Sequence, residues 1–185
     1  MKKRLRIEYF LVAAVMLLLF VGSIAATNFF FQKEMVAQQE TYLRRKNTLL
    51  TDQLPPSVFE KGQLTNQQQL LVTHALDDAE ERVTLLQKNG TVFFDSSQNE
   101  PLESHKKRPE IAAVLSGAAY GSALRKSKTL NKELLYVATP VLKSGEIVGI
   151  IRISEQTALF SKNIQSFRRY IIFTFGILFL LITLF

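Results

Sequence analysis

The sequence predicts an α+β domain in which helices pack on an antiparallel sheet, carried between two apolar segments. Three observations predict this class. Uncharged apolar runs lie near both ends of the 185 residues, the patterning changes from helical to strand-like near residue 82, and tight-turn residues join the β-rich runs. The chain is 47% hydrophobic and 21% charged, a composition typical of folded or membrane-associated proteins.

The first apolar segment, residues 9–31, contains no charged residue. About 20 apolar residues in a helix cross the ~30 Å hydrocarbon core of a bilayer, so we expect a transmembrane helix here. The basic residues within 1–8 place the N-terminus in the cytoplasm by the positive-inside rule. A secretory signal peptide cleaved near Ala25 is the alternative, but the apolar run continues beyond that point. Gly22 and Ala26 have the small-residue spacing that permits close helix packing.

The second apolar segment is residues 170–185, preceded by Arg168 and Arg169, which we expect at the outer membrane interface. Sixteen helical residues rise only about 24 Å, less than the ~30 Å hydrocarbon core. We therefore expect a truncated second transmembrane helix whose parent protein continues into the cytoplasm. Residues 32–169 would then form one extracytoplasmic domain.

The first helix should extend beyond the membrane. Apolar residues recur every seven positions along this part of the helix, which suits packing against a partner helix. This heptad stripe consists of Val36, Leu43 and Leu50, flanked by Met35, Tyr42 and Leu49. Pro55-Pro56 should end the helix. Thr65 and Gln68 form a Thr-x-x-Gln capping box, which predicts a second helix running to about Glu81.

The strand-like patterning begins with two β-rich runs joined by Asn89-Gly90, which favours a hairpin with a type I′ turn. A short helix should start at Pro109 and end at Gly117, with Ile111, Val114 and Leu115 facing the sheet. Further strands are predicted at residues 120–127, 133–141 and 146–154, the last two joined through Lys143-Ser144-Gly145.

Five stretches, in this order, resemble the extracytoplasmic PAS/Cache-like sensor domain of phosphate-regulon-type sensor histidine kinases of Gram-positive bacteria. They are NGTVFFDS, SHKKRPEI, SALRKSKTL, LLYVATPV and GIIRIS. Ser104 departs from the family, where an asparagine is expected. The resemblance implies a PAS/Cache-like antiparallel sheet with a long N-terminal helix, flanked by two transmembrane helices.

The resemblance also implies a function. The domain would sense an extracytoplasmic ligand and, acting as a homodimer in the cell membrane, control autophosphorylation and phosphotransfer to a response regulator. ATP and Mg would bind only in a cytoplasmic part beyond Phe185, so no cofactor is expected in this segment. The alternatives are the N-terminal part of a Cache-type chemoreceptor and a membrane-anchored extracytoplasmic binding protein.

The candidate ligand site lies where a basic loop meets the helix at Pro109. His105 and Arg108 could bind a carboxylate or phosphate there, with Arg125, Ser127 and Tyr136 as partners. The alternative is a solvated loop that leads into an ordinary helix start, with Tyr136 packed in the sheet.

Other polar residues have simpler interpretations. We expect His74 to be a half-buried packing residue. A solvated helix face, and not a cation site, is expected for the acidic run of Asp77, Asp78, Glu80 and Glu81. The sequence contains no cysteine and no common enzyme motif, so we expect neither a metal site nor catalysis within this segment. The extracytoplasmic placement and the interleaved acidic residues argue against nucleic-acid binding.

Overall fold

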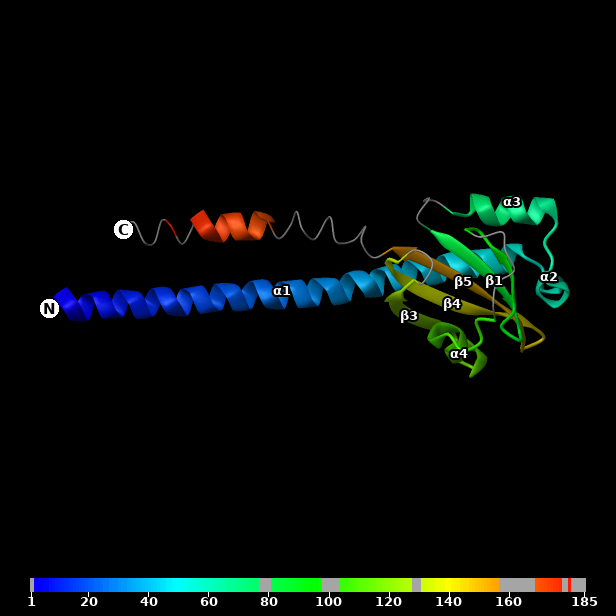
Figure 1. Ribbon diagram of the computed structural model, residues 1–185, viewed down its shortest axis with the longest axis horizontal. Coiled ribbons are helices and arrows are strands. Elements are labelled where there is room, and N and C mark those ends of the chain that lie inside the picture. Colours follow the sequence, from blue (N-terminus) through cyan, green and yellow to red (C-terminus); the bar gives the residue numbers. More distant parts are fainter. Residues whose placement is uncertain are drawn as a thin grey trace. The chain divides into compact units, whose positions relative to one another are not determined.

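Five strands form one sheet in the order β2-β1-β5-β4-β3, with every neighbouring pair antiparallel (Figure 1). The α+β class and the antiparallel sheet are therefore confirmed. The strands β3, β4 and β5 occupy the three predicted runs, with β5 at the centre of the sheet. The strands are β1 (Arg82–Gln87), β2 (Val92–Asp95), β3 (Gly121–Lys126), β4 (Glu133–Lys143) and β5 (Glu146–Gln156).

This structure, a computed structural model, describes part of the chain: residues 2–76, 81–97, 104–127, 131–156, 169–177 and 180. The chain divides into two compact units. One unit is Ala37–Thr157 and contains the sheet, and the other combines Met1–Val36 with Ala158–Phe185.

The hairpin at Asn89-Gly90 is present, but its turn is not type I′. That turn needs a positive φ at both central residues, and only Gly90 has one, at 86°. The N–H of Gly90 donates to the carbonyl of Gln87 at 2.8 Å, which makes a turn closed by a left-handed glycine. The loop between β4 and β5 has the type I′ signature instead, because Ser144 (φ 52°) and Gly145 (φ 85°) are both left-handed.

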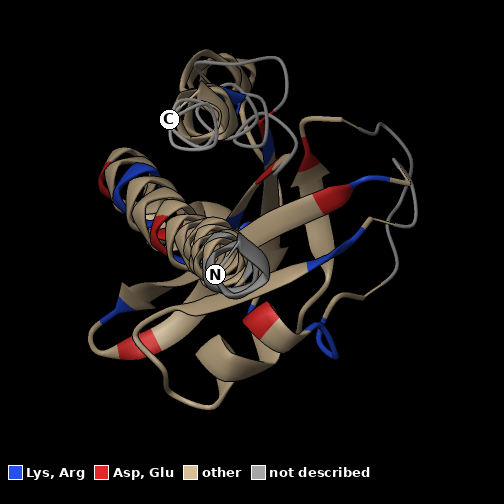
Figure 2. Cartoon of the chain, turned by 90° about the vertical axis from the view of Figure 1, so that its left-hand side faces the viewer, with Lys and Arg blue, Asp and Glu red and all other residues tan. Residues whose placement is uncertain are grey.

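The helix α1 (Lys2–Gln53) covers one face of the sheet with its C-terminal part (Figures 1 and 2). Leu43 and Leu50 are buried within the domain, so this half of the predicted stripe does not face a partner helix. Tyr42 and Leu49 remain exposed. The side chain of Asn47 is fully buried and donates to the carbonyl of Val137 on β4 at 2.9 Å, which fixes α1 to the sheet.

Two short helices follow α1. The sequence did not predict α2 (Pro56–Lys61), whose buried Phe59 packs against Gly149 on β5. A Cβ atom on Gly149 would lie 2.6 Å from the Cβ of Phe59, so glycine permits this contact. The predicted capping box of Thr65 and Gln68 is confirmed at the start of α3 (Asn66–His74), although this helix ends well before Glu81.

The helix α4 (Pro109–Leu115) packs on the opposite face of the sheet (Figure 2). Proline starts this helix as predicted, because its missing N–H is not needed in the first turn. Gly121 on β3 allows the close approach, since a Cβ there would lie 2.1 Å from the carbonyl oxygen of Glu110. The apolar core on this face consists of Leu86, Val92, Ile111, Val114, Ala138 and Ile150, with Leu115 packed against it.

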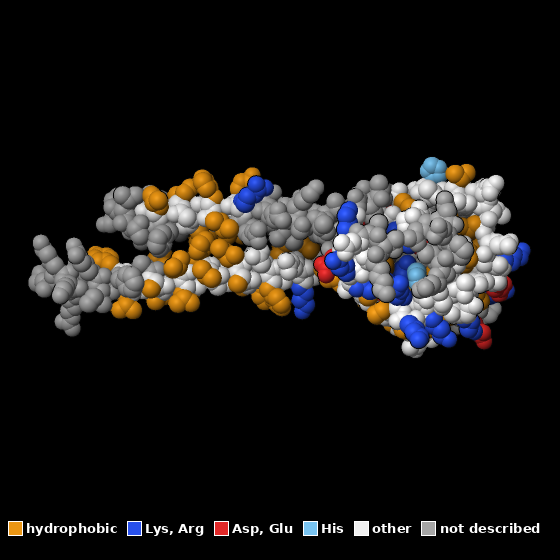
Figure 3. Space-filling model, viewed as in Figure 1, with side chains coloured by type: hydrophobic (Ala, Val, Ile, Leu, Met, Phe, Trp, Pro, Cys, Tyr) orange, Lys and Arg blue, Asp and Glu red, His pale blue; other side chains and the backbone are white. Residues whose placement is uncertain are grey.

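One described helix, over Ala14–Gln53 within α1, is long and apolar enough to cross a membrane, by length and composition. Its most apolar window has a mean hydropathy of 2.1 and none of it is buried. Figure 3 shows the exposed hydrophobic side chains along this stretch. Residues 169–177 are also helical, and the rings of Phe20 and Phe175 lie 5.1 Å apart. Most of residues 178–185 and Arg168 lie outside the described residues, so the second span and its interface arginines stay predictions.

Candidate functional site

A row of polar side chains crosses the α4 face of the sheet. The strand register places Asp95 on β2, Thr84 on β1 and Arg152 on β5 directly abreast. The same row continues with Ala138 on β4 and Gly121 on β3. These two small residues leave room on the sheet where the first turn of α4 brings Glu110 against it.

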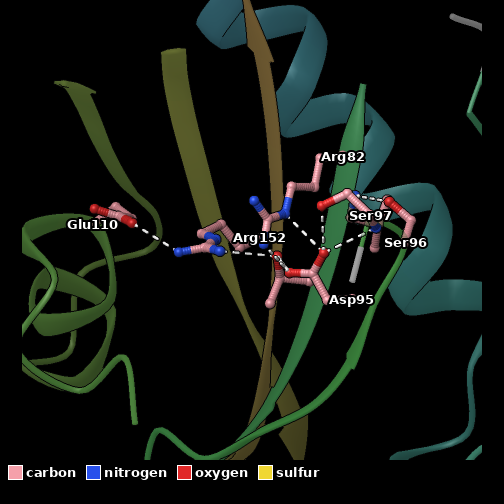
Figure 4. Close-up of polar contacts among 8 residues, drawn as sticks. Arg82, Asp95, Ser96, Ser97, Glu110 and Arg152 are labelled. Carbon is pink, nitrogen blue, oxygen red and sulfur yellow. Dashed lines mark hydrogen bonds and ion pairs between the residues drawn. The ribbon is translucent and has the colours of Figure 1, made fainter. Parts of the chain in front are cut away.

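Hydrogen bonds connect this row without a break (Figure 4). The guanidinium of Arg152 donates to the hydroxyl of Thr84 at 2.9 Å, and this hydroxyl donates to Asp95 at 2.9 Å. Arg82 binds the two carboxylate oxygens of Asp95 through Nε at 2.7 Å and Nη2 at 2.9 Å. The backbone N–H and the hydroxyl of Ser97 each donate to Asp95 at 3.0 Å. The two-point contact between Arg82 and the carboxylate of Asp95 is of a kind that ranks among the stronger hydrogen-bonded pairs in proteins.

Glu110 is the acidic centre of the other half of the site. Its side chain is completely buried, and Oε1 accepts from Arg125 at 2.9 Å and from Arg152 at 3.3 Å. Burial alone would raise the pKa of this carboxyl group. The hydrogen bond from Arg125, a hydrogen bond from the backbone N–H of Glu110 and the charges of Arg125 and Arg152 together outweigh burial, so the pKa is lowered below its ordinary value. Glu110 is therefore ionised at neutral pH.

Tyr136 on β4 lies against both arginines. The guanidinium carbon of Arg125 is 3.7 Å from the centre of the Tyr136 ring, and that of Arg152 is 5.1 Å from it. The face of an aromatic ring attracts cations. The orientation of Arg125 thus depends on the tyrosine as well as on Glu110.

His105 is buried in the loop that leads to α4, four positions before the first residue of that helix. Its backbone N–H donates to the carbonyl of Gly90 at 2.9 Å, which joins this loop to the β1–β2 turn. Burial, followed by the positive charges of Arg152 and Arg108, lowers the pKa of the imidazole to about 4. The histidine is therefore neutral at physiological pH, and its Nδ1 has no hydrogen-bond partner among the described residues.

The five predicted ligand residues thus have different surroundings. The structure brings Arg125 and Tyr136 together, and His105 and Arg108 contribute to the same electrostatic environment. Arg108 is the N-cap of α4 and accepts two backbone hydrogen bonds through its carbonyl group, but its side chain does not cap the helix. Ser127 is buried just beyond β3, where its backbone N–H donates to the carbonyl of Lys132 at 2.7 Å. A ligand-binding role for these residues stays a prediction.

Sequence reasoning missed the charged residues at the centre of this site. Glu110 was assigned only to a helix start, and Arg152 was treated as part of a β-rich run. The useful signal was the arginine itself, since a charged residue within the apolar run GIIRIS of a central strand needs a buried partner. The partner could not be identified from the sequence, because Glu110 lies 42 positions away.

Two further interpretations need correction. His74 is exposed at the end of α3 and not half-buried. It borders a groove that is lined also by Lys46, Leu49 and Leu71. Glu81 is buried and forms an ion pair with Lys46 at 2.6 Å, so it does not belong to a solvated face. The rest of the acidic run lies outside the described residues: Asp77, Asp78 and Glu80. Within the described residues, no group of three or more histidine and acidic side chains could hold a metal ion.

Residues 52–156 match the single Cache-like family, and the chain belongs to that family. The V. cholerae histidine kinase DctB sensor domain has a similar fold, with a TM-score of 0.58 and 18% identity over 75% of this chain and 56% of that one. The ligand-binding domain of the Campylobacter jejuni chemoreceptor Tlp3, solved with L-valine, has a TM-score of 0.51 and 13% identity over 78% and 62% of the two chains.

A third similar structure is the extracellular ligand binding receptor from Desulfohalobium retbaense, with a TM-score of 0.53 and 10% identity over 71% of this chain and 25% of that one. The chain therefore spans less than two thirds of each of these solved chains. At such identities, the similarity shows a shared fold. No curated protein matches the sequence.

Proposed function

We propose that the chain is the signal-sensing and transmembrane-signalling portion of a two-component sensor histidine kinase. Residues 32–169 would lie outside the cell, and the two apolar segments would be its membrane spans. Membership of the single Cache-like family supports a sensor role. The sequence resemblance, together with the fold shared with the DctB sensor domain, favours a kinase output. The link to phosphate regulation comes from the sequence resemblance alone.

The observation that carries this proposal is the attachment of α1 to the sheet. The helix contains the membrane-length apolar stretch, and its C-terminal part belongs to the core of the domain. Asn47 bonds to β4, Lys46 forms an ion pair with Glu81 beside β1, and Gln39 donates to Glu155 on β5. A rearrangement of the sheet therefore changes the contacts of α1. Packed elements transmit such changes as discrete shifts.

The signal would enter through the site on the other face of β5. Arg152 points toward α4, whereas Glu155, three positions later, bonds to α1. One central strand thus contacts both the candidate ligand site and the signalling helix. We assign His105, Arg108, Arg125, Ser127 and Tyr136 to binding of a small anion. In the parent protein, a homodimer would transfer phosphate to a response regulator, with ATP and Mg bound in its cytoplasmic part.

A chemoreceptor is the second candidate, because the Tlp3 ligand-binding domain shares the fold. Reading the gene beyond the codon for Phe185 separates the two. A phosphoacceptor histidine in a coiled-coil helix, followed by glycine-rich ATP-binding motifs, supports the kinase. A long heptad array rich in glutamine and alanine would instead assign the chain to a chemoreceptor. An immediate stop codon would leave a membrane-anchored binding protein.

A further inference from the structure

The described polar cluster contains more positive than negative charge. Arg82, Arg125 and Arg152 are cationic, while Asp95 and Glu110 are the anionic groups hydrogen-bonded to them. Asp95 accepts hydrogen bonds from Arg82, Thr84 and Ser97, so Glu110 is the only described carboxylate that is hydrogen-bonded to the two remaining arginines. A buried charge without a counter-charge is costly, so the two arginines require an anionic group bound at this half of the cluster.

The contacts of Glu110 are also incomplete. Both arginines donate to the same oxygen, Oε1, and within the described part of the chain Oε2 has no hydrogen-bond partner. The Nε atoms of Arg125 and Arg152 have none either. A guanidinium normally binds a carboxylate through two parallel hydrogen bonds, as Arg82 does with Asp95. The arginines thus have donors available that the tethered carboxylate of Glu110 does not use.

Two contacts define how this arrangement could change. The backbone of Glu110 is held against Gly121, so its carboxylate leaves the arginines by rotation of the side chain. The ring of Tyr136 holds Arg125 independently of Glu110, at 3.7 Å. The arginines would therefore keep much of their orientation after Glu110 has left.

We propose that Glu110 is an internal carboxylate ligand of the Arg125–Arg152 pair, and that a small external carboxylate binds at this pair by displacing it. This inference rests on the proposed sensor function. A free carboxylate has the same planar group as Glu110 without its tether, so it can use both oxygens and the free Nε donors. The sensor is then occupied at rest by its own side chain, and the ligand acts as a competitor.

The test compares the wild-type chain with Glu110→Gln, both in lipid nanodiscs, with acetate as the probe. The midpoint of thermal unfolding is followed against acetate concentration, with chloride at equal ionic strength as the reference. We expect Glu110→Gln to bind acetate at least about tenfold more tightly than the wild type, because the competitor has lost its charge. Equal stabilisation of Glu110→Gln by acetate and chloride would overturn the proposal.

Three further measurements sharpen this result. Glu60→Gln is the matched control, since Glu60 pairs with Lys143 on the exposed surface, and it should bind acetate like the wild type. The double variant Arg125→Met/Glu110→Gln should lose the increase in acetate affinity that Glu110→Gln shows alone. If Glu110→Gln does not fold, Glu110→Asp replaces it, because its shorter side chain withdraws the carboxylate by one methylene. Glu110→Asp should also bind acetate more tightly than the wild type. An acetate affinity equal to that of the wild type would count against the proposal.

Inorganic phosphate serves as a second probe of the ligand class. Stronger stabilisation of Glu110→Gln by phosphate than by acetate would overturn the assignment of a carboxylate. These assays measure binding alone, so their failure would leave the proposed kinase output untouched, whereas the gene sequence beyond Phe185 tests that output separately.

Discussion

Arg152 and Glu110 form a buried ion pair, with 3.3 Å between Nη1 and Oε1, that joins the central strand β5 to helix α4. The strand also contacts α1 through Glu155 on its other face. The pair therefore links the two layers of helices through a single strand.

Loss of one member of the pair should destabilise the domain strongly. Arg152→Met removes one of the two arginines that bind Glu110 and also the donor to Thr84, and breaking a buried pair from one side typically costs about 3–5 kcal/mol. We expect the double variant Arg152→Met/Glu110→Gln to lose less than the sum of the two single variants, because neither charge is then left alone. Denaturant unfolding in detergent measures both quantities, and strictly additive losses would contradict the described contact.

The stability of the domain should fall on mild acidification because of His105. Its pKa is about 4 in the folded state and 6.5 in the unfolded state, so the unfolded chain binds the proton more readily. This contribution to stability is complete above about pH 6.5 and is lost progressively as the pH falls toward 4. The expected loss is on the order of 1–3 kcal/mol.

The variant His105→Gln should remove this slope between pH 6.5 and 4.5. Glu110, whose folded pKa is lowered, adds a separate loss below about pH 4.5 that the variant retains. Thermal unfolding followed across this range is the measurement, with His74→Gln as the control because His74 is exposed. Parallel curves for the wild type and His105→Gln would show that His105 does not titrate as described.

The capping box of α3 gives a prediction that is independent of the site. Thr65→Ala removes the hydroxyl that accepts the N–H of Gln68, and loss of an N-cap costs about 1 kcal/mol. Thr65→Ser should keep most of that stability. A Thr65→Ala midpoint equal to that of the wild type would show that α3 does not contribute to cooperative unfolding.

Close packing of α2 on the sheet makes Gly149 sensitive to substitution. Gly149→Ala would place a methyl group against the ring of Phe59, and overpacking of this kind costs about 1–3 kcal/mol. Combining it with Phe59→Ala, which removes the ring atoms that meet this methyl group, should cost less than the sum of the two single losses. Urea unfolding of the single and double variants tests this. A double variant that loses the full sum would contradict the contact as the source of the cost.

Features that depend on neighbouring residues could be predicted from the sequence. Thr65 and Gln68 lie three positions apart, and Pro109 starts α4 by its own geometry, so both helix starts were identified correctly. The type I′ prediction at Asn89-Gly90 was wrong, because the hairpin closes with Gly90 alone in the left-handed region. The preference of Asn-Gly for a type I′ turn does not determine the length of the loop, because burial of one strand face sets the register of the two strands.

The candidate site was only partly predictable for the same physical reason. Arg125 and Tyr136 were identified as candidates, but their relation to Glu110 and Arg152 depends on the register of β3, β4 and β5. Register brings together residues that are far apart in the sequence. The periodicity of one run shows which face is buried, but it does not show which run is the neighbour or which residues pair. The heptad stripe shows a similar limit, since Leu43 and Leu50 fit a partner helix and a sheet equally well until the packing is known.

We propose that the site on the α4 face controls the output of a kinase. The most direct measurement is the autophosphorylation rate of the full-length parent in nanodiscs, compared among the wild type, Arg125→Ala, His105→Ala and the exposed control Lys107→Ala. Arg125→Ala and His105→Ala should each change the rate while the domain stays folded, and Lys107→Ala should leave it at the wild-type value. Wild-type rates in both site variants would contradict the account.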